Sequence, residues 1–124
     1  MARPDTVVNL ADKLAQIAEH WSPRTVGQLN DLHIKVVKLQ GEFVWHQHDD
    51  TDEFFLVLSG KMTIQLADRE DVTLGAGEFF IVPKGVQHRP VAAHECEVVL
   101  LEPAGTVNTG DAESSELTAD PAWL

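Results

Sequence analysis

The side chains best able to do chemistry in this chain are His46, His48, Glu53 and His88. On a strand, residues i and i+2 point to the same face, about 7 Å apart at Cα, so His46 and His48 can converge on one ion. Glu53 follows an acidic turn, and His88 follows the tight turn at residues 83–85. Three imidazoles and one carboxylate are a ligand set for one divalent ion of Fe, Mn, Ni, Zn, Co or Cu. Such a set leaves coordination positions open, as catalytic metal sites do.

The elements that must position these groups are short apolar segments separated by turn residues. Many short strands with closely spaced turns predict an all-β sandwich or barrel. The predicted strands cover residues 32–39, 42–48, 53–58, 61–67, 71–74, 78–82, 87–91 and 96–101. Glu53 can reach the two histidines if its strand pairs with theirs as a hairpin.

One long helix is expected before the strands. Apolar residues from Val7 to Trp21 recur at steps of three and four, which is one face of an α-helix. The predicted helix covers about residues 6–21, begins at Asp5 or Thr6, and ends at the proline that follows Ser22. A barrel would then occupy about residues 24–110.

The small, acidic texture of residues 111–124 predicts a solvated tail, although the terminal Trp123 and Leu124 could dock back onto the domain. The length of 124 residues fits a single domain.

Composition excludes some classes of partner. The formal net charge of -11 disfavours nucleic acid and anionic membrane surfaces. Cys96 is the one cysteine and cannot form an intrachain disulfide. The sequence shows no pattern of a targeting signal and no apolar stretch of membrane-spanning length, so we expect a cytoplasmic protein.

The spacing of these residues resembles the two motifs of the cupin family. Residues 41–48 with Glu53 and Gly60 are similar to the first motif, and Gly77, residues 83–85 and His88 to the second. Two departures are visible: the spacer from Gly41 to His46 is one residue short, and Ala92 stands where asparagine is frequent.

The resemblance implies a fold and a metal site. The expected fold is all-β, a double-stranded β-helix (jelly-roll) cupin barrel with one N-terminal α-helix, over residues 1–124. The expected metal ligands are His46, His48, Glu53 and His88. The size resembles small phosphomannose-isomerase-like cupins, which is a likeness of fold and no sign of sugar isomerisation.

Two functions remain open at this stage. One is a metalloenzyme acting on a small organic substrate, with its catalytic residues unknown. Dioxygenase chemistry is slightly favoured over isomerase or lyase chemistry, because no distinct base stands beside the ligands. The alternative is a non-catalytic, metal-dependent sensor or small-ligand binding module.

Substrate-binding candidates are weaker than the metal ligands. Phe55, Met62 and Phe80 are expected to line the interior, where apolar residues are first of all a core. Lys84 and Arg89 flank the second motif and could receive an anionic substrate, although solubility explains exposed cations equally well.

A homodimer is expected from the outer wall of the barrel. Strand alternation sends Phe43 and Trp45 outward, and likewise Phe54, Leu56 and Leu58. One short helix is unable to cover both strands, and monomers rarely expose a contiguous apolar patch beyond a few hundred Å². A second copy packed by two-fold symmetry is the commonest remedy.

Overall fold

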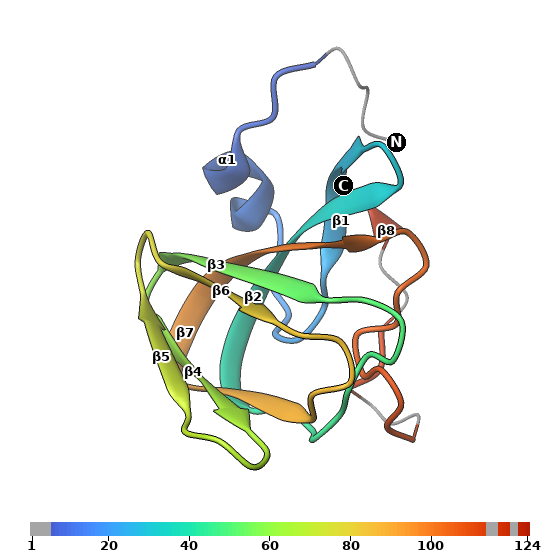
Figure 1. Ribbon diagram of the computed structural model, residues 1–124. Helices are drawn as coiled ribbons and strands as arrows, with labels where there is room; N and C mark the ends of the chain where they lie inside the picture. The colour runs from blue at the N-terminus through green and yellow to red at the C-terminus, as the bar shows by residue number, and fades with distance from the viewer. Residues whose placement is uncertain (1–5, 114–116, 120–121) are drawn as a thin grey trace.

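The computed structural model, which describes residues 6–113, 117–119 and 122–124, is built mainly of antiparallel strands wrapped around one apolar interior (Figure 1). This confirms the predicted all-β jelly-roll barrel with a single short helix. The strands are β1 (Arg24–Leu29), β2 (Leu32–Glu42), β3 (Glu53–Ser59), β4 (Lys61–Leu66), β5 (Val72–Gly75), β6 (Phe79–Val82), β7 (His88–Pro103) and β8 (Ala122–Trp123).

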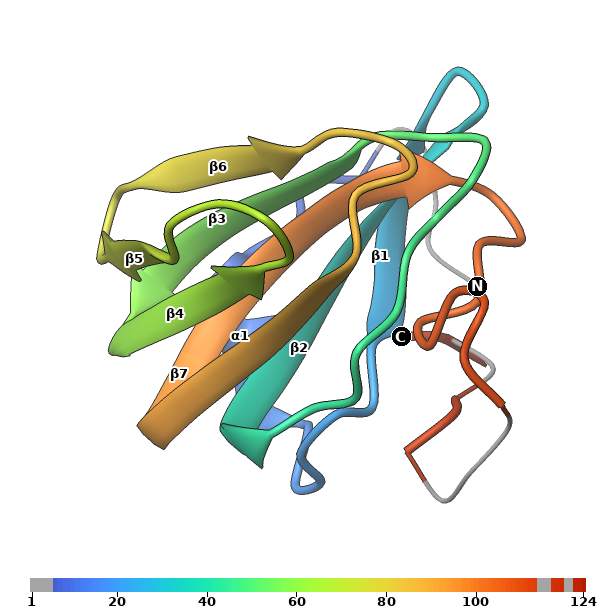
Figure 2. The same cartoon turned by 60° about the horizontal axis from the view of Figure 1, so that its bottom comes forward.

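The strand that organises the barrel is β7, which is 16 residues long. Its second half lies between β2 and β3, and its first half pairs with β4 as well as with the end of β2. The hairpin of β4 and β5 and the edge strand β6 then close the side opposite β1 (Figure 2). Because β7 contacts both halves, it sets the position of β3 relative to β4.

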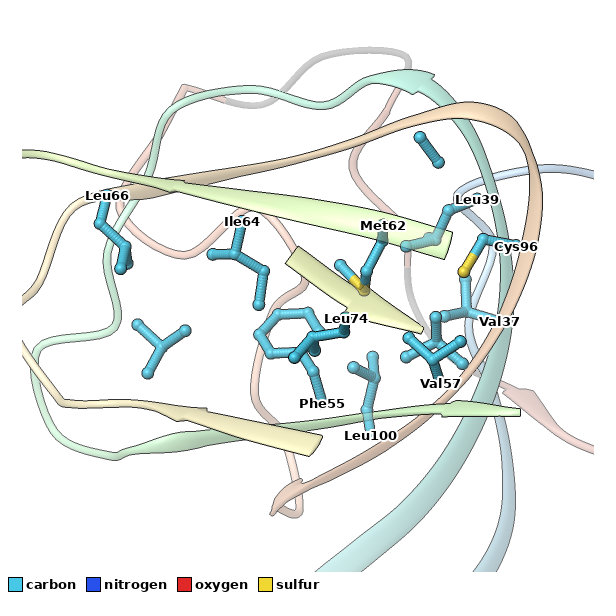
Figure 3. Packing of buried hydrophobic residues seen from close by; sticks show 13 residues of the cluster. Val37, Leu39, Phe55, Val57, Met62, Ile64, Leu66, Leu74, Cys96 and Leu100 are labelled. Atoms are coloured by element: carbon cyan, nitrogen blue, oxygen red, sulfur yellow. The ribbon is translucent and has the colours of Figure 1, made fainter. Parts of the chain in front are cut away.

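The apolar core fills the interior between these walls (Figure 3). Strand β3 alternates as predicted, with Glu53, Phe55 and Val57 buried inside. The remaining buried members come from β2, β4, β5, β6 and β7: Val37, Leu39, Met62, Ile64, Leu66, Leu74, Val82, Ala92, Cys96, Val98 and Leu100. The tight turn from β3 to β4 needs Gly60, because φ is +83° there and a Cβ would lie 2.7 Å from the Glu95 carbonyl oxygen.

The predicted helix over residues 6–21 is wrong in its extent. Helix α1 covers only Leu10–Ala15, and its N-cap is Asn9, whose side chain accepts a hydrogen bond of 3.0 Å from the Asp12 amide. Leu14 and Ile17 are buried as the periodicity predicted, and they pack over the outer face of β1, β2 and β7. Among the described residues, no helix is long and apolar enough to cross a membrane.

Trp21, at the far end of the predicted helix, packs on the barrel instead. Its φ is 61°, which no helix accommodates, and its ring stacks on Phe43 with 4.7 Å between centroids. Its indole N–H also donates to the Gln40 carbonyl oxygen at 2.9 Å. The end of the helical pattern thus turns onto the barrel.

The predicted outward direction of Phe43 is also wrong. Its side chain is buried because it stays in phase with the inward-facing Val37 and Leu39 of β2, and the alternation changes only between Phe43 and His46, beyond the end of the strand. Trp45 does face outward and is 40% exposed.

The last residues of the tail dock back onto the domain, as the sequence allowed for Trp123 and Leu124. Strand β8 pairs in parallel with β1, and the Leu124 amide donates to the Thr25 carbonyl oxygen at 2.9 Å. Nζ of Lys13 donates a hydrogen bond to the Leu124 carbonyl oxygen at 2.8 Å. Residues 114–116 and 120–121 of the predicted tail lie outside the described residues.

Because the core is packed from side chains on all walls, we expect a truncation there to be costly. Leu74 is 6% exposed and Leu29 is 54% exposed. Leu74→Ala should lower the free energy of unfolding by about 2 to 5 kcal/mol, from lost burial and the cavity left behind. Leu29→Ala should change it by less than about 0.5 kcal/mol. Urea unfolding of the two variants measures both values, and equal losses would contradict this assignment of the core.

Candidate metal centre

The structure brings the four predicted metal ligands together at one end of the barrel interior. His46 and His48 lie between β2 and β3, whereas Glu53 opens β3 and His88 opens β7. All four side chains are buried, and one ligand atom from each lies within 4.8 Å of the others. The predicted cluster of three imidazoles and one carboxylate is therefore present as a three-dimensional site.

A short backbone bridge sets the position of two of these imidazoles. The His46 amide donates to the His88 carbonyl oxygen at 3.0 Å, and the His88 amide donates to the His46 carbonyl oxygen at 2.8 Å. The two ring centroids are consequently 4.3 Å apart. The Gly85 amide donates to the His48 carbonyl oxygen at 2.8 Å, so the turn of the second motif also fixes the third histidine.

Backbone carbonyl groups orient the same two imidazole rings. Nδ1 of His46 lies 3.0 Å from the Val44 carbonyl oxygen, and Nδ1 of His88 lies 2.9 Å from that of Val86. A carbonyl oxygen only accepts, so each Nδ1 carries the proton. The lone pair of each ring is then on Nε2, which is the atom available to an ion.

The remaining contacts test whether a metal ion fits. Oε1 of Glu53 lies 3.2 Å from Nε2 of His48 and 3.2 Å from Nε2 of His88. Nε2 of His48 is nevertheless buried without a hydrogen bond of acceptable geometry. An ion bound to all four groups would give Nε2 of His48 a partner and would also accept the lone pairs of the other three ligands. The residues present therefore fit a divalent metal.

Burial and mutual charge shift the titration of the cluster. Burial, together with neighbouring His88, lowers the pKa of His46 to about 4. Burial also opposes the charge on His48, but the carboxylate of Glu53 outweighs it and raises the pKa of His48. Burial disfavours ionised Glu53, yet His48 and His88 hold its pKa well below the usual range. At neutral pH the site thus offers a carboxylate and an unprotonated His46 to a cation.

A buried ion pair beside the site was missed from the sequence. Nζ of Lys35 lies 2.9 Å from Oε1 of Glu102, with both side chains inside the barrel. Glu102 follows Leu101, whose partner on β3 is Phe54, so its carboxyl group neighbours Glu53. Burial, and then the charge of Glu53, raises the pKa of Glu102 to about 8.

The sequence did contain a signal for this pair. Glu102 continues the alternation of Cys96, Val98 and Leu100, which all point inward, and Lys35 continues that of Val37 and Leu39. A charged residue in phase with a buried face needs a partner of opposite charge.

Two of the metal ligands, His46 and Glu53, border a small apolar cavity of about 30 Å³. This volume has room for about two water molecules. Its lining comes from the barrel, from the segment before β1 and from the chain after β7: Trp21, Pro23, Val37, Leu39, Phe43, His46, Glu53, Phe55, Pro90, Leu100 and Asn108. Phe43 stands edge-on to His46, at 5.4 Å between centroids, and Trp21 stacks behind it.

Of the five predicted substrate-binding residues, Phe55 alone lines this cavity. Met62 is fully buried in the core, and Phe80 packs against that core. Lys84 is exposed on the turn after β6.

Arg89 faces away from the cavity, toward the outer surface. Its Nε donates to Oε1 of Gln65 at 2.8 Å, and its guanidinium lies 5.5 Å from the ring centroid of Trp45. Gln65 on the neighbouring strand β4 therefore accepts a hydrogen bond from the guanidinium group that was predicted to bind an anionic substrate.

Comparison with known proteins agrees with this architecture. Residues 34–102 match the Cupin_2 family, described as a cupin domain. A cupin-2 domain containing protein from Shewanella frigidimarina has a solved structure that is 47% identical, with a TM-score of 0.76, covering 78% of this chain and 94% of that one.

Two dioxygenases also resemble the chain. A 3-hydroxyanthranilate 3,4-dioxygenase from Jannaschia sp. is 34% identical over 74 residues, which are 57% of this chain and 41% of that protein. The chain thus spans less than half the length of this curated relative. The structure of hydroquinone 1,2-dioxygenase PnpCD in complex with Fe3+ is 18% identical, with a TM-score of 0.68, covering 73% of this chain and 30% of that one, and shows likeness of fold alone.

Acid should empty the site in a graded way. Ligation needs an unprotonated imidazole, and the raised pKa of His48 makes this ring take a proton before His46 does as the pH falls. Bound metal per chain should therefore be highest above neutral pH and fall progressively between about pH 7 and pH 5. Metal analysis after dialysis at each pH measures this.

The matched control for acid release is His94→Ala, which removes an exposed imidazole and should leave the curve unchanged. Constant metal content down to mildly acidic pH would contradict a centre built from these histidines.

Proposed function

Because the chain belongs to the cupin family, we propose that it is a metalloenzyme that uses one divalent ion on a small organic molecule. The observation that carries the proposal is the convergence of four buried ligand atoms within 4.8 Å, beside an apolar cavity. Four protein ligands leave one or two positions open on a five- or six-coordinate ion, as catalytic metal sites require.

The reaction class that we propose is oxygenation of the dioxygenase type. An Fe(II) ion in this ligand set would supply the redox centre for dioxygen chemistry. The curated relative from Jannaschia carries that class of activity. The apolar walls of this chain would exclude bulk water, and the carbonyl groups of Val44 and Val86 would keep Nε2 of His46 and His88 turned to the ion.

The cavity supports oxygenation better than isomerase or lyase chemistry, which needs a nearby base. Its polar lining residues are His46 and Glu53, which are metal ligands, and Asn108, which is neutral. Glu102 is a carboxyl group close to the site, but it lies behind Glu53 and outside the lining. Among the described residues, the cavity therefore offers no free general base.

The lining also defines the class of substrate. Within the described part of the chain, neither lysine nor arginine lines the cavity, and the chain has a net charge of -11. A substrate body that carries a carboxylate or phosphate would meet no counter-charge apart from the metal. We infer a small, uncharged, planar body such as an aromatic diol, packed beside Phe43 once Trp21 has shifted to admit it.

Oxygen consumption tests this function. The Fe(II)-loaded protein should take up O₂ with one of a panel of catechol, diketone and thiol substrates, and catechol should exceed its carboxylated analogue by about tenfold or more in kcat/KM. His46→Ala should lose this uptake, because it removes a metal ligand, whereas His94→Ala should retain it.

Absence of uptake across the whole panel, together with tight binding of a panel member to the loaded protein, would favour the non-catalytic binding or sensor role. A preference for the carboxylated catechol would contradict the substrate class but leave oxygenation standing.

We also propose that the chain forms a homodimer through the outer face of β3 and β6. Helix α1 covers Leu56 and Leu58, so the apolar patch is smaller than the sequence suggested. Phe79 and Ile81 remain 59% and 46% exposed, and Phe54 stacks on Phe79 at 5.0 Å between centroids. Strand β6 pairs only with β3 among the described strands, so its other edge is available to a second copy.

Light scattering at micromolar concentration should give a dimer mass. Phe79→Lys should shift it to the monomer, because the new charge would be buried between two copies. Leu29→Lys introduces the same charge at another exposed leucine and should leave the dimer intact. A monomer mass for the wild-type protein would exclude this interface.

A further inference from the structure

The segment of residues 108–111, here called the strap, runs beside two of the metal ligands from the far end of the sequence. Neither cupin motif includes it, and no sequence pattern connects it with the metal. In the structure it lies directly against His46 and Gln47. Its contacts therefore bear on the geometry of the site.

The strap takes the place of a missing neighbouring strand. The amide and carbonyl groups of His46 both bond to His88, so those of the next residue, Gln47, point to the other side. There the Gln47 amide donates to Oδ1 of Asp111 at 2.8 Å, and the Asp111 amide donates to the Gln47 carbonyl oxygen at 3.1 Å. The ligand-bearing segment is thus held by hydrogen bonds on both sides.

Close packing adds to these hydrogen bonds. Gly110 has φ of +55°, and a Cβ at this position would collide with the Gln47 carbonyl oxygen and lie 3.0 Å from Cδ2 of His46. The backbone of the strap therefore lies flat against the edge of a ligand imidazole. Only glycine allows this approach without displacing His46 or the strap.

The strap is itself anchored. Asn108 lines the metal cavity, its amide nitrogen donates to the Leu117 carbonyl oxygen, and its amide oxygen accepts from the Ala119 amide, both at 2.8 Å. Thr109 is 1% exposed, and its hydroxyl pairs with that of Thr118 at 3.0 Å. With both ends of the Asn108 amide occupied, its role at the cavity is to hold the strap.

We propose that Asn108, Gly110 and Asp111 are positioning residues of the metal centre, which act on the ion through His46 and His48. The inference rests on the metal site of the proposed function, but it requires no particular reaction. It predicts that docking of the strap and binding of the metal are energetically coupled. Groups that orient metal ligands typically contribute about 10- to 100-fold in affinity.

Calorimetric titration with Co²⁺ tests the coupling on the full chain. Asp111→Ala removes the acceptor for the Gln47 amide, and Gly110→Ala pushes the strap off His46. Each should weaken Co²⁺ binding by about tenfold or more. Asp111→Asn keeps the acceptor oxygen and should stay close to wild-type affinity. The matched control Asp71→Ala removes an exposed aspartate elsewhere and should bind as the wild type does.

Two further readouts separate positioning from general loss of structure. Thermal unfolding of the metal-free variants reports folding, and if Gly110→Ala does not fold, Asp111→Ala carries the test alone. In the wild-type protein, Co²⁺ should slow hydrogen exchange at the amides of Gln47 and Asp111, because coupling between two binding events is reciprocal.

The results that would overturn the proposal are distinct. Wild-type affinity in a folded Asp111→Ala variant would sink it, as would equal weakening by Asp111→Asn, which would show that charge alone matters. A wild-type protein that binds no Co²⁺ would remove the metal centre itself, whereas normal Co²⁺ binding without oxygen uptake would affect only the proposed reaction.

Discussion

The metal centre depends on a pair of backbone hydrogen bonds between His46 and His88. The segment that carries His46 and His48 has left the regular ladder of β2, so no continuous strand fixes its path. The bridge ties it to the first residue of β7, and β7 in turn holds β2, β3 and β4. A site whose ligands come from three separate stretches of chain is thereby fixed to one rigid strand.

Charge inside the barrel is the second constraint. Glu53, Glu102 and Lys35 are all buried close to the ligand histidines, where isolated charges are costly. Because the pKa of Glu102 is raised to about 8, its carboxyl group is mostly protonated at neutral pH and accepts a hydrogen bond from Lys35, which leaves the carboxylate of Glu53 for the cation. A divalent ion at the four ligands therefore offsets a charge that the apolar interior would otherwise leave without a counter-ion.

In the proposed function, the apolar lining would add selectivity to this electrostatic arrangement. Phe43, Phe55 and Trp21 would give a small-molecule ligand contact area but no counter-charge, so the polar atoms of that ligand would bind the metal. The lysine and arginine next to the second motif do not alter this, because Arg89 bonds to Gln65 and Lys84 is exposed on its turn. Lys84 and Arg89 are therefore close to the second motif in sequence but do not line the cavity.

The sequence by itself determined the barrel and the four metal ligands, because strand alternation, turn glycines and ligand spacing are local properties that residues 41–88 carry directly. It missed the burial of Phe43, since the alternation of β2 continues as far as this residue and changes phase only before His46. It also missed the pairing of Lys35 with Glu102, and the strap with its contact between Asp111 and Gln47. Those features join residues more than 60 positions apart, and only the path of the folded chain decides which distant groups become neighbours.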